Sequence, residues 1–265
     1  MIYVDGVKIE TGHYPDNTLL VKAPTLRGTP DGCVTFTWFY ENDAELFTLI
    51  CLKKHFAHKK TSYLWMPYCP HARMDRVKNG EDVFTLKYFA EVINSLNFTQ
   101  VSIYDPHSSV CTALINNVRV LEPSPFISEA LCTLNSDKDD FMVFYPDEGA
   151  MKRYSGMFKI PYAFGVKKRD WATGQILGLD AMGDVEGIQG KRVLIIDDIC
   201  SKGGTFYHSA KKLRELGASK VYLYITHCEN TIFEGELLKT DLIDKIYTTN
   251  SIFTKEHEKI EVFKL

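Results

Sequence analysis

Two adjacent carboxylates and a loop of small residues form the most chemically informative stretch of this chain. An apolar run at 193–196 leads into Asp197 and Asp198, and a Gly-Gly-Thr sequence follows before a helix-like run. Such an apolar run is typical of a strand buried on both faces of a parallel sheet, and ligands bind beyond the carboxyl ends of such strands. Neighbouring carboxylates can accept hydrogen bonds from two ribose hydroxyls, whereas glycines let backbone N–H groups converge on a phosphate at a helix N-terminus.

We therefore predict a ribose-phosphate site in this stretch. Its candidate substrate-binding residues are Asp197, Asp198, Ser201, Lys202, Gly203, Gly204 and Thr205. Taken singly, the carboxylates could belong to a turn and the glycines to an ordinary helix start. The order of apolar run, two acids, short spacer and Gly-Gly-Thr favours the ribose-phosphate interpretation.

The elements that must position this site alternate between strands and helices. Strand-like runs lie at 34–39, 62–66, 101–104, 141–145, 193–196, 221–226 and 245–248, and helix-like runs at 43–54, 85–96, 149–159, 205–216 and 233–238. This alternation predicts an α/β fold with mainly parallel sheets and flanking helices. One βαβ pattern ends and another begins at the segment 123–125, Pro-Ser-Pro, so we expect two domains, 1–123 and 124–265.

Composition narrows the class of protein. The chain has 265 residues, 45% of them hydrophobic and 25% charged, as expected of a soluble globular protein. A net charge of -3 does not favour nucleic-acid binding. The sequence has neither an 18-residue apolar run nor a signal peptide, so we expect a cytoplasmic protein that does not bind membranes. Its seven cysteines match no disulfide or zinc pattern and are expected to be reduced core thiols.

Further groups of polar residues follow in a fixed order along the chain. Residues 67–76 read Pro-Tyr-Cys-Pro-His-Ala-Arg-Met-Asp-Arg, and Asp-Pro-His occurs at 105–107. Tyr-Pro-Asp-Glu-Gly occupies 145–149, Lys-Lys-Arg 167–169 and Thr-His 226–227. Each group alone could be a solvated charge run, a surface ion pair or a capped strand end. In these motifs and their order, over roughly residues 12 to 263, the chain resembles the ribose-phosphate diphosphokinase (phosphoribosyl pyrophosphate synthetase) family of the type I phosphoribosyltransferase fold.

The resemblance implies two phosphoribosyltransferase-like domains and a pyrophosphoryl transfer. Domain 1–123 would bind ATP, and domain 124–265 would bind the ribose phosphate. The enzyme would move the pyrophosphoryl group of ATP to the anomeric hydroxyl of a 5-phosphorylated ribose and release AMP. The implied partners are ATP with Mg²⁺, the sugar phosphate, and further copies of the chain in a homo-oligomer.

Each matching position carries an implied role that its chemistry supports. Lys167 and Arg169 are the candidate catalytic residues, because cations stabilise the charge that develops on the transferred phosphates. His107 and Asp147 are candidate ligands of Mg²⁺, which combines few protein ligands with phosphate oxygens and water. The candidate ATP-binding residues are Arg73, Asp75, Arg76, Tyr14, Asp16 and His107.

The chain departs from the family at positions that bear on the acceptor and on assembly. Ser201 and Lys202 stand where the family has Asp and Thr, so the loop is more positive by two charges. This change resembles what is expected of phage-type relatives that make ADP-ribose pyrophosphate for NAD resynthesis, and it slightly favours ADP-ribose over ribose 5-phosphate as the acceptor. The segment 14–18, which contacts a neighbouring subunit's ATP in the family, retains Tyr14 and Asp16 but lacks the family's Glu.

Two alternatives from other classes stay open. One is a phosphoribosyltransferase that consumes phosphoribosyl pyrophosphate with a nucleobase, and it would not need Lys167, Arg169 or the 67–76 motif. The other is a non-catalytic regulatory homologue, which would have no reason to retain Lys167, Arg169, His107 and Asp147.

Overall fold

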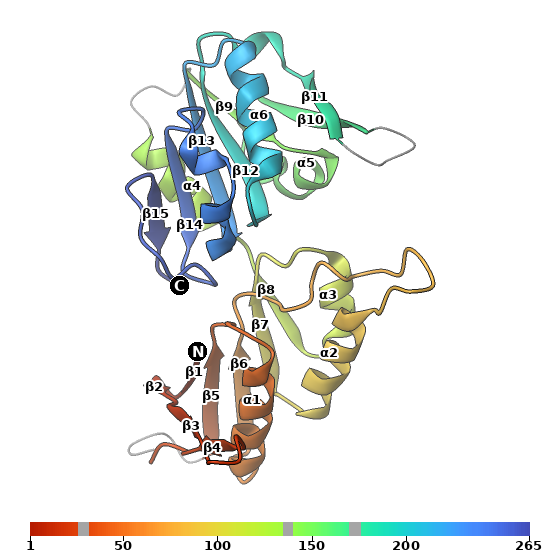
Figure 1. Ribbon diagram of the computed structural model, residues 1–265, viewed down its shortest axis with the longest axis vertical. Coiled ribbons are helices and arrows are strands. Elements are labelled where there is room, and N and C mark those ends of the chain that lie inside the picture. The colour runs from red at the N-terminus through yellow and green to blue at the C-terminus, as the bar shows by residue number, and fades with distance from the viewer. Residues whose placement is uncertain (26–31, 135–139, 170–175) are drawn as a thin grey trace. The chain divides into compact units, whose positions relative to one another are not determined.

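The computed structural model describes residues 1–25, 32–134, 140–169 and 176–265, without the side chains of 167–169 and 176–178. The chain divides into two compact units, Met1–Glu122 (unit 1) and Pro123–Leu265 (unit 2). Each unit has a mainly parallel sheet with flanking helices, which confirms the predicted α/β class (Figure 1). Within the described ranges, no helix is long and apolar enough to cross a membrane. The roles expected for the two halves stay predictions.

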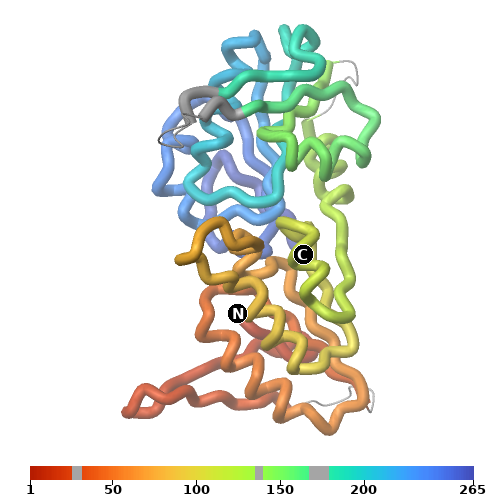
Figure 2. The backbone as a smooth tube through the Cα atoms, turned by 90° about the vertical axis from the view of Figure 1, so that its right-hand side faces the viewer, coloured from red at the N-terminus to blue at the C-terminus, as the bar shows by residue number. Residues whose placement is uncertain are grey.

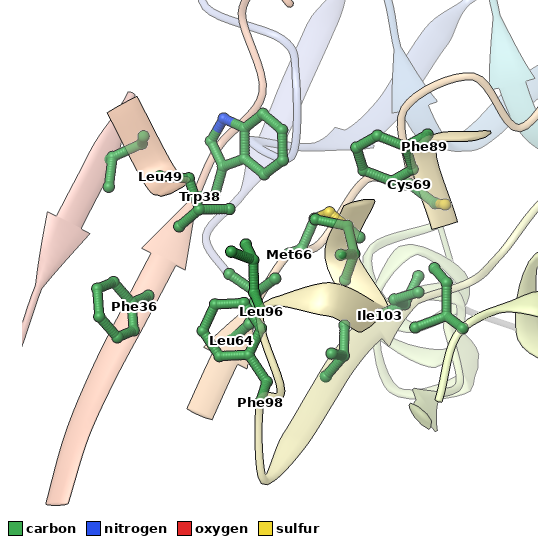
Figure 3. Packing of buried hydrophobic residues seen from close by; sticks show 14 of the residues in the cluster. Phe36, Trp38, Leu49, Leu64, Met66, Cys69, Phe89, Leu96, Phe98 and Ile103 are labelled. Carbon is green, nitrogen blue, oxygen red and sulfur yellow. The ribbon is translucent and has the colours of Figure 1, made fainter. Parts of the chain in front are cut away.

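Unit 1 contains a six-stranded sheet in the order β2-β1-β5-β6-β7-β8. Its strands are β1 (Ile2–Val4), β2 (Val7–Lys8), β5 (Cys33–Trp38), β6 (Thr61–Trp65), β7 (Gln100–Tyr104) and β8 (Val118–Leu121). Strands β5 to β8 run parallel, and β1 pairs antiparallel with β5. Helices α1 (Ala44–His55), α2 (Thr85–Ser95) and α3 (Ser109–Leu114) follow successive strands. Alternate residues of β5 and β6, among them Phe36, Trp38 and Leu64, are buried in the core with Phe89 of α2 (Figure 3).

A short hairpin, β3 (Thr11–His13) and β4 (Leu19–Val21), pairs only within itself. Figure 2 shows it as an arm that projects from the rest of unit 1. The predicted ATP-contacting segment 14–18 forms the tip of this arm.

Unit 2 contains a seven-stranded sheet in the order β11-β10-β9-β12-β13-β14-β15. Its strands are β9 (Phe141–Tyr145), β10 (Tyr162–Arg169), β11 (Ile176–Gly183), β12 (Arg192–Cys200), β13 (Lys220–Cys228), β14 (Lys245–Thr249) and β15 (Ile260–Phe263). All neighbours are parallel except β10 and β11. Its helices are α4 (Ser124–Thr133), α5 (Glu148–Tyr154) and α6 (Gly204–Glu215), and its 3-10 segments are η2 (Glu186–Ile188), η3 (Asn230–Glu234) and η4 (Leu237–Lys239).

The central strand β12 is buried on both faces. Val193 and Ile195 pack in the cluster that includes the apolar side of α6, whereas Leu194 and Ile196 pack with α4 and α5 (Figure 1). All four side chains are completely buried. The prediction of a strand covered on both faces is thus confirmed, because each face of the sheet carries its own helices.

Several predicted boundaries were wrong. Strand β12 continues to Cys200 instead of ending at 196, because its polar half keeps pairing with β13. The helix predicted at 149–159 ends at Tyr154. The helix predicted at 233–238 is instead the pair η3 and η4, interrupted at Gly235, whose backbone is extended. The cysteines are all free, yet Cys132 is exposed and so is not a core thiol.

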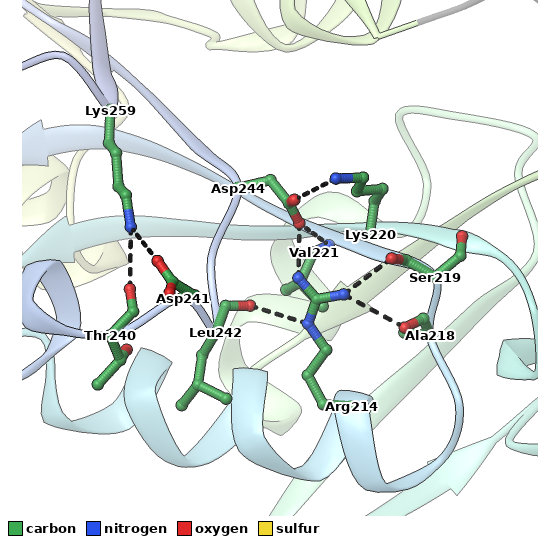
Figure 4. Close-up of polar contacts among 10 residues, drawn as sticks. All are labelled: Arg214, Ala218, Ser219, Lys220, Val221, Thr240, Asp241, Leu242, Asp244 and Lys259. Atoms are coloured by element: carbon green, nitrogen blue, oxygen red, sulfur yellow. Dashed lines mark hydrogen bonds and ion pairs between the residues drawn. The ribbon is translucent and has the colours of Figure 1, made fainter.

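An ion-pair network ties the C-terminal end of α6 to the sheet (Figure 4). Arg214 of α6 donates to Asp244 (2.7 Å) and to the Leu242 carbonyl (3.2 Å). The Asp244 carboxylate also accepts from Lys220 Nζ (2.8 Å) and Val221 N (2.9 Å). Although burial acts to raise it, the pKa of Asp244 lies below its ordinary value because these donors stabilise the carboxylate. The network fixes α6, and with it the position of the helix N-terminus.

Candidate active site

The polar end of β12 and the N-terminus of α6 form the predicted ribose-phosphate site. Asp197 and Asp198 lie within β12, three residues before the loop that leads to Gly203. Gly203 is the N-cap of α6 with a φ of 79°, a left-handed conformation that glycine adopts without strain. Gly204 begins the helix with ordinary φ, so the expected need for positive φ applies to Gly203 alone. The first N–H groups of α6 therefore lie at the strand-end loop, as an anion site requires.

Three carboxylates gather at this edge of the sheet, and Asp198 among them pairs with an arginine. Asp198 is 3% exposed, and its Oδ2 lies 3.0 Å from Nη1 of Arg153 on α5. Asp147 is the N-cap of α5, and its Oδ1 accepts from Ala150 N (3.1 Å). Burial, the adjacent Asp198 and then Asp147 raise the pKa of Asp197 well above its ordinary value. The structure thus brings Asp147, Asp197 and Asp198 together where β9 and β12 end.

Sequence reasoning did not assign Arg153 to the site. Arg153 lies about one and a half helical turns beyond Asp147 on α5. In the sequence it was recognisable only as a basic residue that follows the 145–149 motif. Its guanidinium also lies over the Tyr154 ring, 5.4 Å from the centroid. Another unassigned residue is His227, paired with Ile199 across β12 and β13. His227 is buried, and its Nδ1 lies 2.8 Å from Ser251 Oγ.

The two unusual loop residues contact a neighbouring segment of unit 2. Ser201 Oγ lies 3.1 Å from Thr231 Oγ1 in η3. Lys202 Nζ lies 3.0 Å from Glu234 Oε2, and both side chains are more than half exposed. The positive charge that we expected Lys202 to add to the loop is therefore balanced by Glu234.

The candidate catalytic residues Lys167 and Arg169 lie in β10. The pairing of β10 with β11 shifts between Lys168 and Arg169. The side chains of these residues lie outside the described part of the structure, so their roles stay predictions.

In unit 1, the predicted ATP-binding residues gather around one buried carboxylate. Asp75 is 8% exposed, and its Oδ1 accepts from Arg76 Nε (2.9 Å), while the Arg76 side chain is 70% exposed. Burial acts to raise the pKa of Asp75, but Arg76, Ser108 and the charge of His107 hold it below its ordinary value. His107 therefore lies near Asp75, although 32 positions separate them in the sequence. Arg73 is exposed in the same irregular segment.

The remaining predicted ATP contacts are at the tip of the β3–β4 arm. Tyr14 is 53% exposed. Asp16 Oδ1 accepts from Thr18 N (3.0 Å) and Thr18 Oγ1 (2.7 Å), and these bonds lower the pKa of Asp16. The turn is thus preformed, with an aromatic ring presented to solvent.

Among the residues that the structure describes, no group of three or more His, Cys, Asp or Glu is arranged to hold a metal ion. The two predicted metal ligands belong to different units, His107 to unit 1 and Asp147 to unit 2. Elsewhere in unit 2, a cavity of about 690 Å³ lies at the opposite edge of the sheet, beside Phe141 at the start of β9. It is lined by none of the predicted site residues.

Comparison with known proteins identifies the class and then the family. Residues 174–265 match the family described as the phosphoribosyl synthetase-associated domain. The fold resembles the crystal structure of phosphoribosylpyrophosphate synthetase from Mycobacterium smegmatis, with a TM-score of 0.75 and 20% identity over 97% of this chain and 86% of that one. The fold is therefore that of an α/β protein with phosphoribosyltransferase-like domains.

Curated relatives are closer in sequence. Ribose-phosphate pyrophosphokinase 1 of Listeria monocytogenes is 31% identical over 234 residues, which is 83% of this chain and 69% of the relative. The ribose-phosphate pyrophosphokinase of Thermococcus kodakarensis is 27% identical over 257 residues, 94% of this chain and 87% of the relative. The chain belongs to the ribose-phosphate pyrophosphokinase family and is an ATP-dependent diphosphotransferase. The more specific resemblance to ADP-ribose-using relatives stays a prediction.

Proposed function

We propose that this protein transfers the pyrophosphoryl group of ATP to the anomeric hydroxyl of ribose 5-phosphate, giving phosphoribosyl pyrophosphate and AMP. The observation that carries the proposal is the pair Asp197 and Asp198 followed by a left-handed Gly203 at the N-terminus of α6, in a chain of this family. This arrangement offers carboxylates for a diol and backbone N–H groups for a phosphate.

Acceptor binding would use the edge of the sheet in unit 2. Asp197 and Asp198 would accept hydrogen bonds from the ribose hydroxyls, and the amides of Gly203, Gly204 and Thr205 would bind the 5-phosphate. Arg153 would hold the Asp198 carboxylate in place, because their ion pair is largely removed from solvent.

In the transfer step, the anomeric oxygen would attack the β-phosphorus of ATP. The bond from that phosphorus to the oxygen bridging it to the α-phosphate breaks, AMP leaves, and the hydroxyl proton passes to water. Lys167 and Arg169 would stabilise the charge that develops on the β- and γ-phosphate oxygens.

Magnesium fits the chemistry of the acidic cluster in unit 2. Asp147 offers carboxylate oxygen, the ligand type that Mg²⁺ prefers, and a cation near it would act against the raised pKa of Asp197, which burial and then the neighbouring carboxylates cause. Asp147 is the residue of unit 2 that we propose as a ligand of Mg²⁺, and His107 stays a predicted ligand on unit 1. When bound, Mg²⁺ would neutralise charge on the phosphates of ATP.

ATP would be bound by unit 1, which corresponds to the predicted domain 1–123. Arg73 and Arg76 can bind phosphates or stack on adenine, and Asp75 and His107 shape the same area. Tyr14 and Asp16 would reach the ATP of a neighbouring copy in a homo-oligomer, since they lie on a projecting arm with a preformed turn. Sedimentation of the active enzyme as a monomer would contradict this last assignment.

ADP-ribose is the second candidate acceptor, and Lys202 favours it. A diphosphate that continues to another group would benefit from a cation in the loop, whereas a terminal monophosphate does not need one. The names of the relatives favour ribose 5-phosphate, and Glu234 balances the lysine, so we place ribose 5-phosphate first.

Phosphorus NMR of the protein with Mg²⁺, ATP and each acceptor tests the proposal. We expect AMP and an anomeric diphosphate in equal amounts, and less product with Asp198→Asn at the same subsaturating acceptor concentration. Formation of ADP would instead indicate single phosphoryl transfer. Absence of AMP with both acceptors would contradict the proposed function.

A further inference from the structure

Residues 201–203, which connect β12 to α6, form the acceptor loop. The segment of residues 229–237 after β13 holds this loop in place, although no sequence motif pointed to that segment. Gly235 lies against the backbone of Lys202 so closely that a Cβ added to it would stand 1.8 Å from the Lys202 carbonyl oxygen. A Cβ added to Gly203 would stand 3.0 Å from Leu237. Glycine is therefore required at 235 by space, since its backbone is extended and any residue could adopt it.

Side chains of the same segment reach the loop. Thr231 Oγ1 contacts Ser201 Oγ (3.1 Å) and also donates to Glu229 Oε2 (3.0 Å). Glu234 Oε2 pairs with Lys202 Nζ (3.0 Å). The two loop residues that distinguish this chain from its family are thus the two whose side chains contact η3.

We propose that Glu234 is a specificity-determining residue of the acceptor site. It competes with the ligand for Lys202, so the loop presents little net positive charge to an acceptor that ends in a monophosphate. To bind Lys202, the second phosphate of an acceptor must displace Glu234 from the lysine. The same phosphate is then repelled by the Glu234 carboxylate, which stays close to it. Glu234 therefore opposes diphosphate-bearing acceptors, and this inference rests on the proposed function of the loop.

Because Lys202 and Glu234 are exposed, we expect Glu234 to act through its charge on the acceptor and not through the stability of the fold. Both side chains are more than half exposed, and ion pairs of this kind contribute little to stability. Attraction or repulsion at about 4 Å still changes the binding of a charged ligand, and here it acts on the second phosphate of a diphosphate-bearing acceptor, which a monophosphate lacks. Removing Glu234 should therefore alter acceptor choice while leaving the fold unchanged.

Calorimetric Kd values for ribose 5-phosphate and ADP-ribose test the inference with Glu234→Gln. We expect the affinity ratio of ADP-ribose to ribose 5-phosphate to rise about five- to tenfold, and the rise to shrink in 0.5 M salt because exposed charges are screened. Glu234→Asp should restore the wild-type ratio. In a Lys202→Met background, the rise in the affinity ratio caused by Glu234→Gln should fall by at least half. Without the lysine, Glu234→Gln removes only the repulsion between Glu234 and the second phosphate.

Glu236→Gln is the matched control, because Glu236 lies in the same segment, is similarly exposed and pairs with Lys239 instead. Its ratio should stay within twofold of the wild type. If the wild type binds acceptor and the affinity ratio of Glu234→Gln stays within twofold of the wild-type ratio, the inference about Glu234 is overturned and the proposed function is not. Failure of the wild type to bind either acceptor would instead overturn the proposed function.

The backbone contact is tested separately with Gly235→Ala. Pushing the Lys202 carbonyl away should weaken both acceptors alike, by about tenfold, without changing the KM for ATP. Gly156→Ala is the control, because nothing lies within 4 Å of a Cβ there. Thermal unfolding shows whether the Gly235→Ala variant is folded. If the folded variant binds both acceptors as the wild type does, the segment does not position the acceptor loop.

Discussion

The predicted acceptor site of unit 2 and the predicted ATP site of unit 1 are built in opposite ways. Asp197 and Asp198 lie inside a nine-residue strand between two parallel neighbours, and Asp198 is almost fully buried. Arg73 and Arg76 lie in an irregular segment between β6 and α2, with their side chains largely in solvent. The acceptor site presents two carboxylates on regular structure, whereas the ATP site presents exposed cations on a loop around the buried carboxylate of Asp75.

The difference follows from the cost of burying charge. A buried carboxylate needs a fixed partner, and Arg153 supplies one for Asp198 through an element held against the same sheet. An arginine that stays in solvent avoids this cost, and Arg76 remains 70% exposed while its Nε donates to Asp75. We infer that the acceptor site is preorganised, whereas the ATP site is completed by its ligand.

The largest expected effect concerns transfer itself. Lys167→Ala or Arg169→Ala should lower kcat by about 10²-fold, because each would remove a cation that acts on charge developing during transfer. The Kd of the acceptor should change little. Steady-state kinetics with Lys168→Ala as the neighbouring control checks this, and near-normal kcat in both variants would remove the catalytic assignment.

A smaller effect is expected for the preorganised carboxylate. Asp198→Asn should weaken acceptor binding by about 1.5–3 kcal/mol, the contribution of hydrogen bonds to a charged group. The KM for ATP should stay within about twofold if the two sites bind independently. Calorimetry with Asp241→Asn, an exposed carboxylate paired with Lys259, provides the control. A parallel loss of ATP affinity would break the division between the two units.

Loss of one exposed cation should cost less. Arg73→Ala or Arg76→Ala should raise the KM for ATP by about five- to tenfold and leave acceptor binding unchanged, because a solvated arginine exchanges water contacts for phosphate contacts. Arg119→Ala, an exposed arginine in β8, is the matched control for lost surface charge. An equal effect on acceptor binding would show that the ATP role is assigned to the wrong unit.

The smallest expected effect is on stability and depends on pH. Because the pKa of Asp197 is raised in the folded state, the wild type loses stability as pH rises from the unfolded pKa, about 3.9, through the folded one. Asp197→Asn should therefore be more stable than the wild type by about 1 kcal/mol at neutral pH, as for other functional-site replacements.

That gain should disappear in acid below the unfolded pKa, where the wild-type carboxyl is protonated in both states. Denaturant unfolding at pH 3.5 and pH 7 measures both values. Equal stability of the two proteins at pH 7 would contradict a raised pKa of Asp197 in the folded state.

Local pattern predicted most strands of the two parallel cores, several helices and the acceptor loop. The apolar run at 193–196 favours a strand buried on both faces, and the order of two acids and Gly-Gly-Thr after it favours a turn into a helix, so a parallel α/β sheet and a strand-end loop were predictable. The N-terminal strands, β8 and β15 were missed because they are short and their pairing depends on distant partners, and β10 and β11 were missed although each has eight residues.

What the sequence by itself determined is the fold class, the chemistry of each motif and the position of the loop at the end of β12. Only the tertiary structure decided which charges meet: Arg153 with Asp198, Glu234 with Lys202, and His107 beside Asp75. It also decided that β12 continues to Cys200, because pairing with β13 outweighs the polar residues at that end. Periodicity and turn chemistry act over a few neighbouring residues, whereas the partner of a charge is set by how strands and helices pack.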